Sequence, residues 1–430
     1  MVKKLRIAAI FLLLLLGAIY GYWQLRKYQS LRQPVHKDAA LIFKINLDAL
    51  LFSELKHPGG PLNAYKNNKL IPEGVSAPSS IVLYSLKKEP LSSFFCVLKI
   101  NDSAALKKYL KNSWKINQFS TDKGGNSYGH STDGRLNVAC NANELAFSYS
   151  LKKTQTKDVL TDLLNKNNLL DPQDPRLQLL KKEPAEFSYI FENYKGTGEF
   201  HHNLLQLRGT IPTHDLNPPA QSVSALAPGP GGVLKFWLNA NLEKTFSKTE
   251  FNLKGHVLEK ARLMKYYGGY IDAEIKNTLS QTDSVITYVY NDDFEKTAQV
   301  QLKEVQVPRL QVKIGSPEPG ALFTYLRDHQ FISEKGVWNR DLFPLYRVYA
   351  STGRNFLSLS TSSEKIGSGT MKPSPYFVYL DIDFNQMKKQ KMFPFLGPYI
   401  ENLEHLQLKG TKTGNEPGKI EMEILFNKGN

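Results

Sequence analysis

The sequence predicts an α+β protein in which one N-terminal transmembrane helix precedes a duplicated unit of antiparallel sheets packed by helices. An uncharged apolar run extends from Ile7 to Trp23, which is close to the length that crosses ~30 Å of hydrocarbon. Most of the remaining chain consists of short segments of alternating apolar and polar residues, typical of strands, between amphipathic helical segments. Several of these segments recur in the same order in the second half, which indicates a duplication.

The apolar run is interpreted as an uncleaved membrane anchor. Lys3, Lys4 and Arg6 precede it, and its last residues are aromatic, as is common at a membrane interface. A cleaved signal peptide is the alternative, but it needs small residues before the cut, and cleavage after Ala18 places Leu16 at one of those positions. A short basic head tends to stay in the cytoplasm. We therefore expect a single-pass protein of the inner (cytoplasmic) membrane with its ectodomain in the periplasm.

Local patterns predict the elements of the first half. Alternation predicts a strand over residues 40–47, and a helix is expected over residues 48–55. Asn101 or Asp102 can cap the next helix, because a short side-chain acceptor satisfies the free N–H groups of a first helical turn. A further helix is expected over residues 156–164. Additional strands are predicted over residues 81–86, 93–100, 136–140 and 144–150.

The clearest internal similarity joins residues 94–110 (FFCVLKINDSAALKKYL) to residues 310–326 (LQVKIGSPEPGALFTYL). In both, a strand containing Lys-Ile is followed by a polar cap and by a helix that ends in Tyr-Leu. Four weaker pairs keep the same order along the chain: 55–60 with 264–269, 136–150 with 346–360, 186–191 with 376–381, and 250–255 with 423–429. The shared order of all five pairs predicts a duplicated α+β unit.

The anchor and the duplication together predict the domain organisation. Residues 1–32 form a cytoplasmic stub and transmembrane anchor, residues 33–255 a first α+β half, and residues 256–430 a second α+β half. The first half contains a Pro- and Gly-rich stretch at residues 208–232, where Pro lacks an N–H donor and Gly has high backbone entropy. We interpret this stretch as a long exposed loop, and loops of this length are often functional.

The composition is that of an ordinary folded chain, with 41% hydrophobic and 22% charged residues. The net charge of +15 favours anionic neighbours, and a generally lysine-rich surface is the simpler explanation for it. No dense basic run is interleaved with aromatic residues, so no nucleic-acid partner is expected. Cys96 and Cys140 each lie in an apolar strand-like segment, where a disulfide and two buried thiols are both compatible with the pattern.

No motif in the sequence specifies a reaction. Phosphate-binding glycine loops, the nucleophile elbow of hydrolases and paired-histidine zinc motifs are all missing from the sequence, and we expect no cofactor. The nearest approach to a metal site is a loop group of imidazoles and a carboxylate: His201, His202, His214 and Asp215. Nothing in the sequence preorganises these ligands, so an exposed polar loop is the preferred interpretation.

Two other groups of side chains are candidate sites. Asp381 and Asp383 share one face of a predicted strand, at a spacing that acid–base chemistry can use. The solvent-facing side of an antiparallel strand shows the same pattern, and we prefer that interpretation. Tyr266, Tyr267 and Tyr270 cluster beside two glycines and are the candidate binding surface of the chain.

One short segment supports a family resemblance. From Pro34 to Leu51 (PVHKDAALIFKINLDALL), a Pro, a short gap and an Asp-Ala pair open the first predicted strand. Together with the anchor and the repeated strand–helix–strand blocks, this layout resembles uncharacterised, membrane-anchored cell-envelope proteins of Bacteroidetes-type bacteria. The resemblance implies a periplasm-facing α+β ectodomain, and it transfers no catalytic residues.

These features predict a membrane-anchored envelope protein with a non-catalytic binding or scaffolding ectodomain. The expected partners are the membrane and either another envelope protein or an anionic polymer. The alternatives are an envelope hydrolase with a site assembled from distant residues and a lipid- or glycan-binding carrier. A deep cleft with converging catalytic side chains would favour the hydrolase, and an apolar tunnel would favour the carrier.

Overall fold

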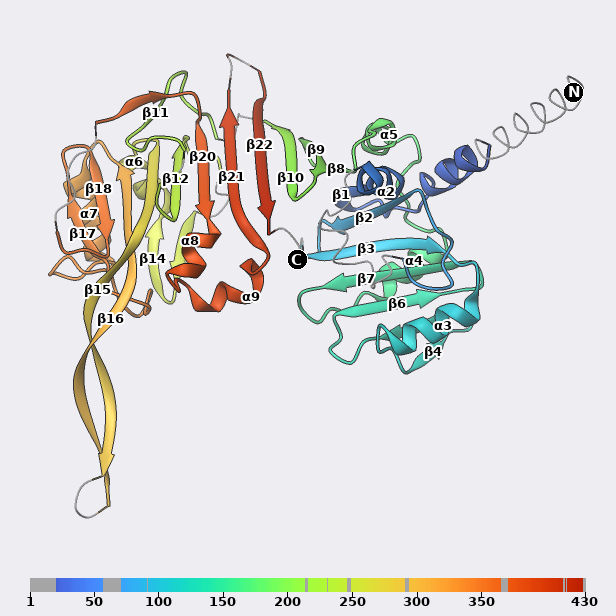
Figure 1. Cartoon of the computed structure of the whole chain (residues 1–430), viewed down its shortest axis with the longest axis horizontal. Coiled ribbons are helices and arrows are strands. Elements are labelled where there is room, and N and C mark those ends of the chain that lie inside the picture. The colour runs from blue at the N-terminus through green and yellow to red at the C-terminus, as the bar shows by residue number, and fades with distance from the viewer. Residues whose placement is uncertain are drawn as a thin grey trace, which may run out of the picture. The chain divides into compact units, whose positions relative to one another are not determined.

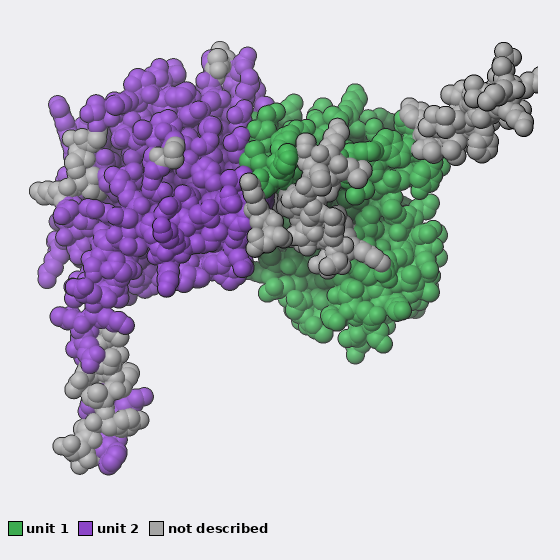
Figure 2. Space-filling model, in the orientation of Figure 1, with its two compact units in different colours: residues 1–209, 428–430 green, residues 210–427 purple. Residues whose placement is uncertain are grey.

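A computed structural model shows that the chain forms two compact units (Figures 1 and 2). Unit 1 ends at Gly209, and unit 2 spans Thr210 to Asn427. The structure describes residues 21–427 except 57–70, 91, 213–215, 230, 246–248, 291–293, 365–369, 413 and 415. The division expected after residue 255 falls inside unit 2, because β12 (Leu234–Asn239) pairs there with both β15 and β20.

The predicted α+β class is wrong, because the protein is predominantly antiparallel β. Of the described residues, 42% lie in strands and 20% in helices. The amphipathic segments form helices of at most 10 residues, whereas the alternating segments pair into continuous sheets. The short helices therefore make up a minor part of a fold that consists mainly of sheet.

The predicted transmembrane helix is not part of the described fold. The run from Ile7 to Trp23 lies outside the described residues except at its end, where residues 21–30 are helical. None of the helices in the described part of the chain is long and apolar enough to cross a membrane.

Unit 1 is built on one antiparallel sheet (Figure 1). Its strands lie in the order β10, β9, β8, β1, β2, β3, β7, β6, β5, β4, and each pair from β9 to β4 is antiparallel. The bounds are β1 (Ala39–Asn46), β2 (Ser80–Leu86), β3 (Ser93–Lys99), β4 (Phe119–Thr121), β5 (Ser127–His130), β6 (Leu136–Cys140), β7 (Glu144–Ser150), β8 (Phe187–Phe191), β9 (Tyr194–His201) and β10 (Leu204–Ile211).

The helices of unit 1 are α2 (Leu47–Lys56), α3 (Ser103–Asn112), α4 (Lys157–Leu164) and α5 (Pro175–Lys182). The predicted cap is confirmed, because the Asp102 carboxylate accepts the first free N–H groups of α3. Helix α5 was not predicted, although Asp174 caps it and Pro175 occupies its first turn, which is a typical helix start. Leu160 and Leu163 of α4 pack on the sheet in the main core of the unit.

Cys96 and Cys140 are both free and buried. They lie on β3 and β6, which are not neighbours in the sheet. Burial raises the pKa of both thiols, so both remain protonated at neutral pH. Of the two possibilities that the sequence left open, the structure contains the pair of buried thiols.

Unit 2 also contains one main antiparallel sheet, with strands in the order β22, β21, β20, β12, β15, β16, β18, β17. The remaining bounds in this sheet are β15 (Tyr270–Tyr290), β16 (Lys296–Gly315), β17 (Tyr349–Thr352), β18 (Phe356–Ser360), β20 (Val378–Asp383), β21 (Leu403–Thr411) and β22 (Gly418–Phe426). Two small pairs lie apart from it: β11 (Ser222–Ser224) with β19 (Lys372–Ser374), and β13 (Glu250–Leu253) with β14 (His256–Glu259). The helices are α6 (Lys260–Tyr266), α7 (Pro319–Asp328), α8 (Phe384–Lys389), the 3-10 turn η2 (Pro394–Leu396) and α9 (Gly397–Ile400).

The two units share one strand order. Six adjacent strands of the unit 1 sheet lie in the order β8, β1, β2, β3, β7, β6. Six adjacent strands of the unit 2 sheet lie in the equivalent order β20, β12, β15, β16, β18, β17. A helix, α3 or α7, follows the corresponding strand β3 or β16 in each unit. The expectation that residues 250–255 and 423–429 are equivalent segments of the two repeats is wrong. Strand β13 forms a separate hairpin, whereas β22 belongs to the main sheet.

The hairpin of β15 and β16 is much longer than its neighbours. The register runs from Ile271 opposite Ile314 to Tyr290 opposite Lys296. Only the first part of β15 pairs with β12 and only the last part of β16 pairs with β18, so the rest extends beyond the sheet as a twisted ribbon (Figure 1). Val300 and Leu302 are exposed on this ribbon, which the sequence did not predict.

Candidate functional site

The main sheet of unit 2 has one apolar face and one polar face. Phe384 and Met387 of α8 pack on Ile275 of β15, and Leu322 of α7 packs near Ile314 of β16. Because successive side chains in a strand point to opposite faces, the residues between these apolar positions lie on the other face. That other face carries the candidate site.

Cross-strand register arranges the polar face in two rows. Directly opposite residues of antiparallel strands lie on the same face, so each row can be followed from strand to strand. The first row consists of Asp381, Lys235, Glu274, Gln311 and Ser360. The second row consists of Tyr379, Trp237, Asp272, Lys313 and Ser358. We call the surface formed by these ten residues the polar sheet face.

Two tyrosine–aspartate pairs lie buried on this side of the sheet, three of their residues in the polar sheet face and Tyr270 in the next row, opposite Asn239. The Tyr270 hydroxyl donates to Asp272 Oδ2 at 2.8 Å, and the Tyr379 hydroxyl donates to Asp381 Oδ2 at 3.0 Å. In both pairs the aspartate lies two residues after the tyrosine on the same strand. Trp237 lies between them, fully buried and stacked on Tyr379 with ring centroids 4.2 Å apart.

The surroundings of the two carboxylates differ. Gln407 Nε2 donates to Asp381 Oδ2 at 2.9 Å, and His405 Nε2 lies 3.2 Å from Asp381 Oδ1. Asp272 is only 1% exposed, and its burial raises the pKa of its carboxyl group to about 6, against the opposing effects of the Tyr270 hydroxyl and the positive charge of Lys313. Asp272 is therefore a carboxylate whose ionisation the fold disfavours.

A segment of the Pro- and Gly-rich stretch lies against this face. Residues 225–229, which we call the strap, are tied down at both ends by the same two tyrosines. The Ala225 N–H donates to the Tyr270 hydroxyl at 3.0 Å, and the Gly229 N–H donates to the Tyr379 hydroxyl at 2.9 Å. Lys235 Nζ donates to the Gly229 carbonyl at 3.0 Å. The stretch predicted as an exposed loop is thus partly ordered over the polar sheet face.

The residues that flank the strap explain its path. Before it, the buried Asn239 amide pairs with the backbone of Val223 on β11, through bonds of 2.8 and 3.0 Å. After it, Gly232 has a φ of +86°, and a Cβ at this position would lie 2.8 Å from the Ile275 carbonyl oxygen. Only glycine adopts this conformation at such a close approach without strain.

Replacing Tyr379 by phenylalanine tests the strap. The change leaves the Gly229 N–H without its acceptor and removes one donor from Asp381, which costs about 1–2 kcal/mol in local stability. We expect faster amide hydrogen exchange at Gly229 with unchanged exchange in unit 1. Phenylalanine at the exposed Tyr399 is the matched control, and equal exchange at Gly229 in both variants would contradict this role of Tyr379.

A cleft of about 620 Å³ opens between the strap and the polar sheet face. Its charged lining comprises four basic residues, Lys235, Lys276, Arg309 and Lys313, and two acidic residues, Glu274 and Glu364. Gln311, Ser360 and Ser362 add neutral hydrogen-bonding groups, and residues 225–227 of the strap form one wall. The lining therefore has a net positive charge.

The cations at the edge of the cleft make only weak internal ion pairs. Lys276 Nζ lies 3.3 Å from Glu274, with the lysine side chain 62% exposed. Arg309 lies 3.5 Å from Glu364, and both of these side chains are largely exposed to solvent. The pair of Arg309 and Glu364 is exposed and contributes little to stability, so an incoming anion can replace Glu364 at small cost, whereas Glu274 is only 13% exposed.

The histidines that the sequence suggested as metal ligands are not brought together in the described structure. His201 ends β9 with its side chain half exposed and 3.7 Å from Glu199, and His202 has a φ of +56° in the turn before β10. His214 and Asp215 lie outside the described residues. Among the residues that the structure describes, no group of three or more potential ligands could hold a metal ion.

The three clustered tyrosines do not form one exposed aromatic surface. Tyr266 is half-buried and contacts Tyr325 of α7. Burial raises the pKa of Tyr267 above its usual range, and Tyr270 is 7% exposed and bonded to Asp272. Tyr270 thus belongs to the candidate site as a buried support of the strap and not as a contact surface.

The two strand aspartates have separate roles. Asp383 caps α8 by accepting the Gln386 N–H at 2.8 Å. Asp381 is 7% exposed, so the expectation of a solvent-facing carboxylate is wrong at this position. Gln407 and His405 of β21 and the hydroxyl of Tyr379 contact its carboxylate. The repeated Tyr-x-Asp pattern was present in the sequence at both sites, but an exposed strand face shows the same alternation.

The fold and the cleft define a predominantly β protein with a cationic cleft on a sheet face. No protein-family model matches the chain, and no curated protein matches it. Three crystal forms of TP0453 are similar among solved structures. Form IV is 12% identical, with 40% of this chain and 77% of that chain covered and a TM-score of 0.27. Forms I and III are each 8% identical, cover 78% and 75% of this chain and 90% and 89% of theirs, and have TM-scores of 0.23 and 0.24. Similarity at this level carries no argument about function.

Proposed function

We propose that this chain is a membrane-attached cell-envelope protein whose ectodomain binds an anionic envelope polymer without chemical turnover. The observation that carries the proposal is the cationic cleft on the polar sheet face of unit 2. A cleft lined mainly by one sign of charge attracts ligands of the opposite sign, and the lining of this cleft has a net positive charge. The apolar run from Ile7 to Trp23 supports attachment to a membrane, with the ectodomain in the periplasm.

The character of the ligand follows from the lining. Lys276 and Arg309 offer exposed charges that can exchange their internal acidic partners for carboxylate or phosphate groups. Gln311 and Ser362 offer hydrogen bonds to neutral oxygens of the same ligand. An anionic polysaccharide combines these two kinds of group. A lipid carrier needs an apolar cavity, which the charged lining disfavours.

The support for a binding role comes from the position of the acidic groups. Asp272 and Asp381 are 1% and 7% exposed and lie beneath the strap, where they bond to tyrosine hydroxyls. A general acid or base must reach the reacting atom within hydrogen-bond distance. The two carboxylates instead accept hydrogen bonds from the tyrosines that hold the strap, so the hydrolase alternative gains no support from them.

Binding of polygalacturonate, a polymer of carboxylated sugars, tests the proposal. The double substitution Lys276→Gln and Arg309→Gln removes the two exposed cations of the cleft and is expected to weaken binding by about tenfold or more. Affinity should also fall as salt is added, because exposed charges are screened. The measurement is a titration of the full chain in detergent with the fluorescently labelled polymer, and neutral dextran serves as the ligand control.

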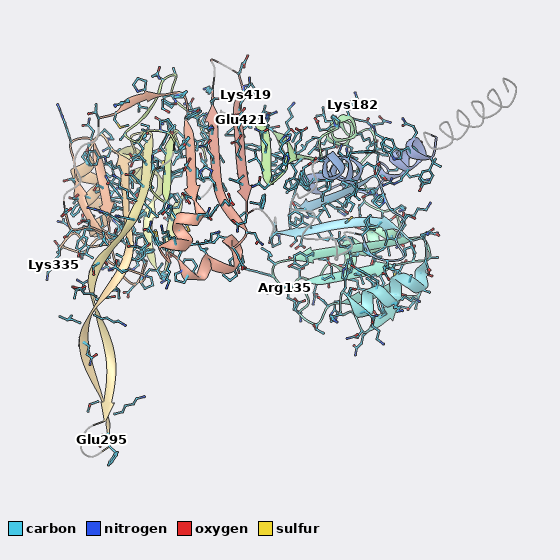
Figure 3. The ribbon with its side chains drawn as sticks, in the orientation of Figure 1. Arg135, Lys182, Glu295, Lys335, Lys419 and Glu421 are labelled. Atoms are coloured by element: carbon cyan, nitrogen blue, oxygen red, sulfur yellow. The ribbon has the colours of Figure 1, made fainter. Side chains whose placement is uncertain are left out.

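The matched protein control is Lys335→Gln with Lys419→Gln, which makes the same change in net charge on unit 2 (Figure 3). Both lysines are exposed and lie outside the lining of the cleft. Equal weakening by the two double variants would assign binding to overall charge and contradict a site in the cleft. Dextran bound as tightly as polygalacturonate would contradict an anionic ligand.

A further inference from the structure

Unit 1 exposes a group of large apolar side chains where the described chain begins. Four of them, Tyr22, Trp23, Leu25 and Tyr28, lie on the helix of residues 21–30, and Leu51 and Phe52 lie on α2. Tyr22 is 65% exposed and Leu51 is 59% exposed. The Trp23 ring meets the Phe52 ring edge-on, with centroids 5.2 Å apart, so the two helices contribute to one surface. Exposed apolar groups gathered in this way indicate an interaction surface.

Specific bonds hold this surface in position on unit 1. The Arg26 guanidinium donates to Asp48 Oδ1 at 2.6 Å, to the Ala77 carbonyl at 2.9 Å and to the Pro78 carbonyl at 3.1 Å. The Ser30 hydroxyl accepts the Ser79 N–H at 2.8 Å. The helix of residues 21–30 is therefore fixed against unit 1, and its exposed side chains keep a defined position on the surface of the unit.

A cationic pocket of about 360 Å³ adjoins the same surface. Trp23 and Phe52 line one part of it, and the basic residues that line it are Lys27, Lys44, Lys181 and Lys182. The two acidic residues of the lining are Asp48, which is paired with Arg26, and Glu183. Lys182 stands at the end of α5 (Figure 3). The pocket thus offers an excess of positive charge beside aromatic side chains.

Lys44 is the most constrained of these cations. It is 2% exposed, and its Nζ donates to the carbonyls of Leu180 and Glu183. Burial and, to a smaller extent, the positive charge of Lys27 lower the pKa of Lys44 to about 8, although the negative charge of Glu183 raises it in part. An anion in the pocket would oppose both effects by favouring the charged form of the lysine.

We propose that this surface of unit 1 lies against a bilayer that contains anionic lipids, with a lipid phosphate in the cationic pocket and the aromatic side chains at headgroup level. Tryptophan and tyrosine are enriched at membrane interfaces, and basic residues are attracted to anionic headgroups. Tyr22 and Trp23 also end the apolar run that begins at Ile7, so the surface continues directly from the segment proposed to enter the membrane. This inference rests on the membrane attachment in the proposed function.

The test uses the full chain reconstituted into vesicles of phosphatidylcholine and phosphatidylglycerol. Phe52→Cys is labelled with an environment-sensitive fluorophore, and lipids with brominated acyl chains act as quenchers. Cys96 and Cys140 are buried and do not compete for the label in the folded protein. We expect about twofold quenching at position 52, because interfacial groups lie at the boundary of headgroups and acyl chains. Leu151→Cys, at an exposed position in unit 1, is the matched control and should not be quenched.

A second pair of variants tests the pocket. Lys181→Gln with Lys182→Gln should lower the ratio of docked to undocked protein, read from the quenching at position 52, by about 25-fold in vesicles with phosphatidylglycerol, since each basic residue near an anionic surface contributes about fivefold. Lys152→Gln with Lys153→Gln makes the same charge change elsewhere on unit 1 and should leave the ratio unchanged. An equal effect of the two double variants would overturn the assignment of a lipid phosphate to the pocket.

The outcomes separate this inference from the proposed function. Protein that floats with the vesicles but shows no quenching at position 52 would overturn the bilayer-facing surface and leave membrane attachment standing. Failure of the protein to float with the vesicles would contradict the proposed membrane attachment itself. Inorganic phosphate without vesicles should leave the emission unchanged, and a response equal to that with vesicles would identify a site for free phosphate and overturn the lipid assignment.

Discussion

Replacing Asp272 by asparagine is expected to stabilise unit 2 by about 3 kcal/mol near pH 8. The carboxyl group of Asp272 is 1% exposed, and its pKa rises from 3.8 to about 6 in the folded protein. Ionising it at neutral pH therefore works against folding. Asparagine has nearly the same shape, and its amide oxygen still accepts the Tyr270 hydroxyl, while the cost of the buried charge disappears.

The pH dependence of this effect has a defined sign. A carboxyl group whose pKa is raised by folding binds a proton more tightly in the folded state. Its favourable contribution is complete below the unfolded value of 3.8 and is lost as the pH rises through about 6. The advantage of the asparagine variant should therefore be small near pH 4 and should grow between about pH 4 and 6.

Urea unfolding with pulsed hydrogen exchange measures this prediction unit by unit. Peptides from β12 and β15 report on unit 2, and peptides from β3 and β7 report on unit 1. Asp283→Asn is the control of opposite sign, because Asp283 pairs with Arg340 through two bonds of 2.7 and 2.9 Å and its loss should destabilise slightly. A D272N variant that is less stable than the natural chain near pH 8 would contradict the argument.

Replacing Trp237 by alanine is expected to cost about 4 kcal/mol in the stability of unit 2. The side chain is fully buried on β12, between β15 and β20, and it stacks on Tyr379 at 4.2 Å. Its Nε1 donates to the Tyr376 carbonyl at 3.1 Å. The substitution opens a large cavity at the centre of the sheet and leaves that carbonyl with only the Ser374 hydroxyl as a donor.

The same exchange measurement checks this prediction. Trp237→Phe keeps most of the ring contact and should cost less than half as much, because it loses mainly one hydrogen bond and a smaller volume. Trp114→Ala is the converse control, since Trp114 packs on Tyr109 and Phe147 within unit 1. Each alanine variant should lower the unfolding midpoint of its own unit more than that of the other. Equal shifts in both units would contradict their separate cores.

Local elements could be predicted where their signals are short-range. The strands β6 (Leu136–Cys140) and β7 (Glu144–Ser150) were predicted with the bounds that they have, because alternation and a polar turn define a hairpin locally. A cap at Asn101 or Asp102 was predicted for the same reason, and Asp102 is the residue that caps α3. The class was misjudged because local amphipathicity shows that a helix exists but not how much sheet surrounds it.

The candidate site could not be predicted, because it depends on register between distant strands. Lys235, Glu274 and Gln311 meet in one row only after β12, β15 and β16 have paired. Asp381 has the spacing of an exposed strand residue, but it is 7% exposed and bonded to side chains of β21, which is distant in sequence. The ribbon of β15 and β16 likewise depends on where neighbouring strands stop pairing, which no local pattern specifies.

The sequence alone determined the apolar N-terminal run, the order of repeated segments and the local starts and ends of several elements. Each of these depends on residues that are close together along the chain. The tertiary structure decided which alternating face is buried, where the Pro- and Gly-rich stretch lies and which charges line the cleft. Burial and electrostatic surroundings arise from contacts between segments that are far apart in sequence, so the pKa of Asp272 and the charge of the cleft exist only in the folded unit.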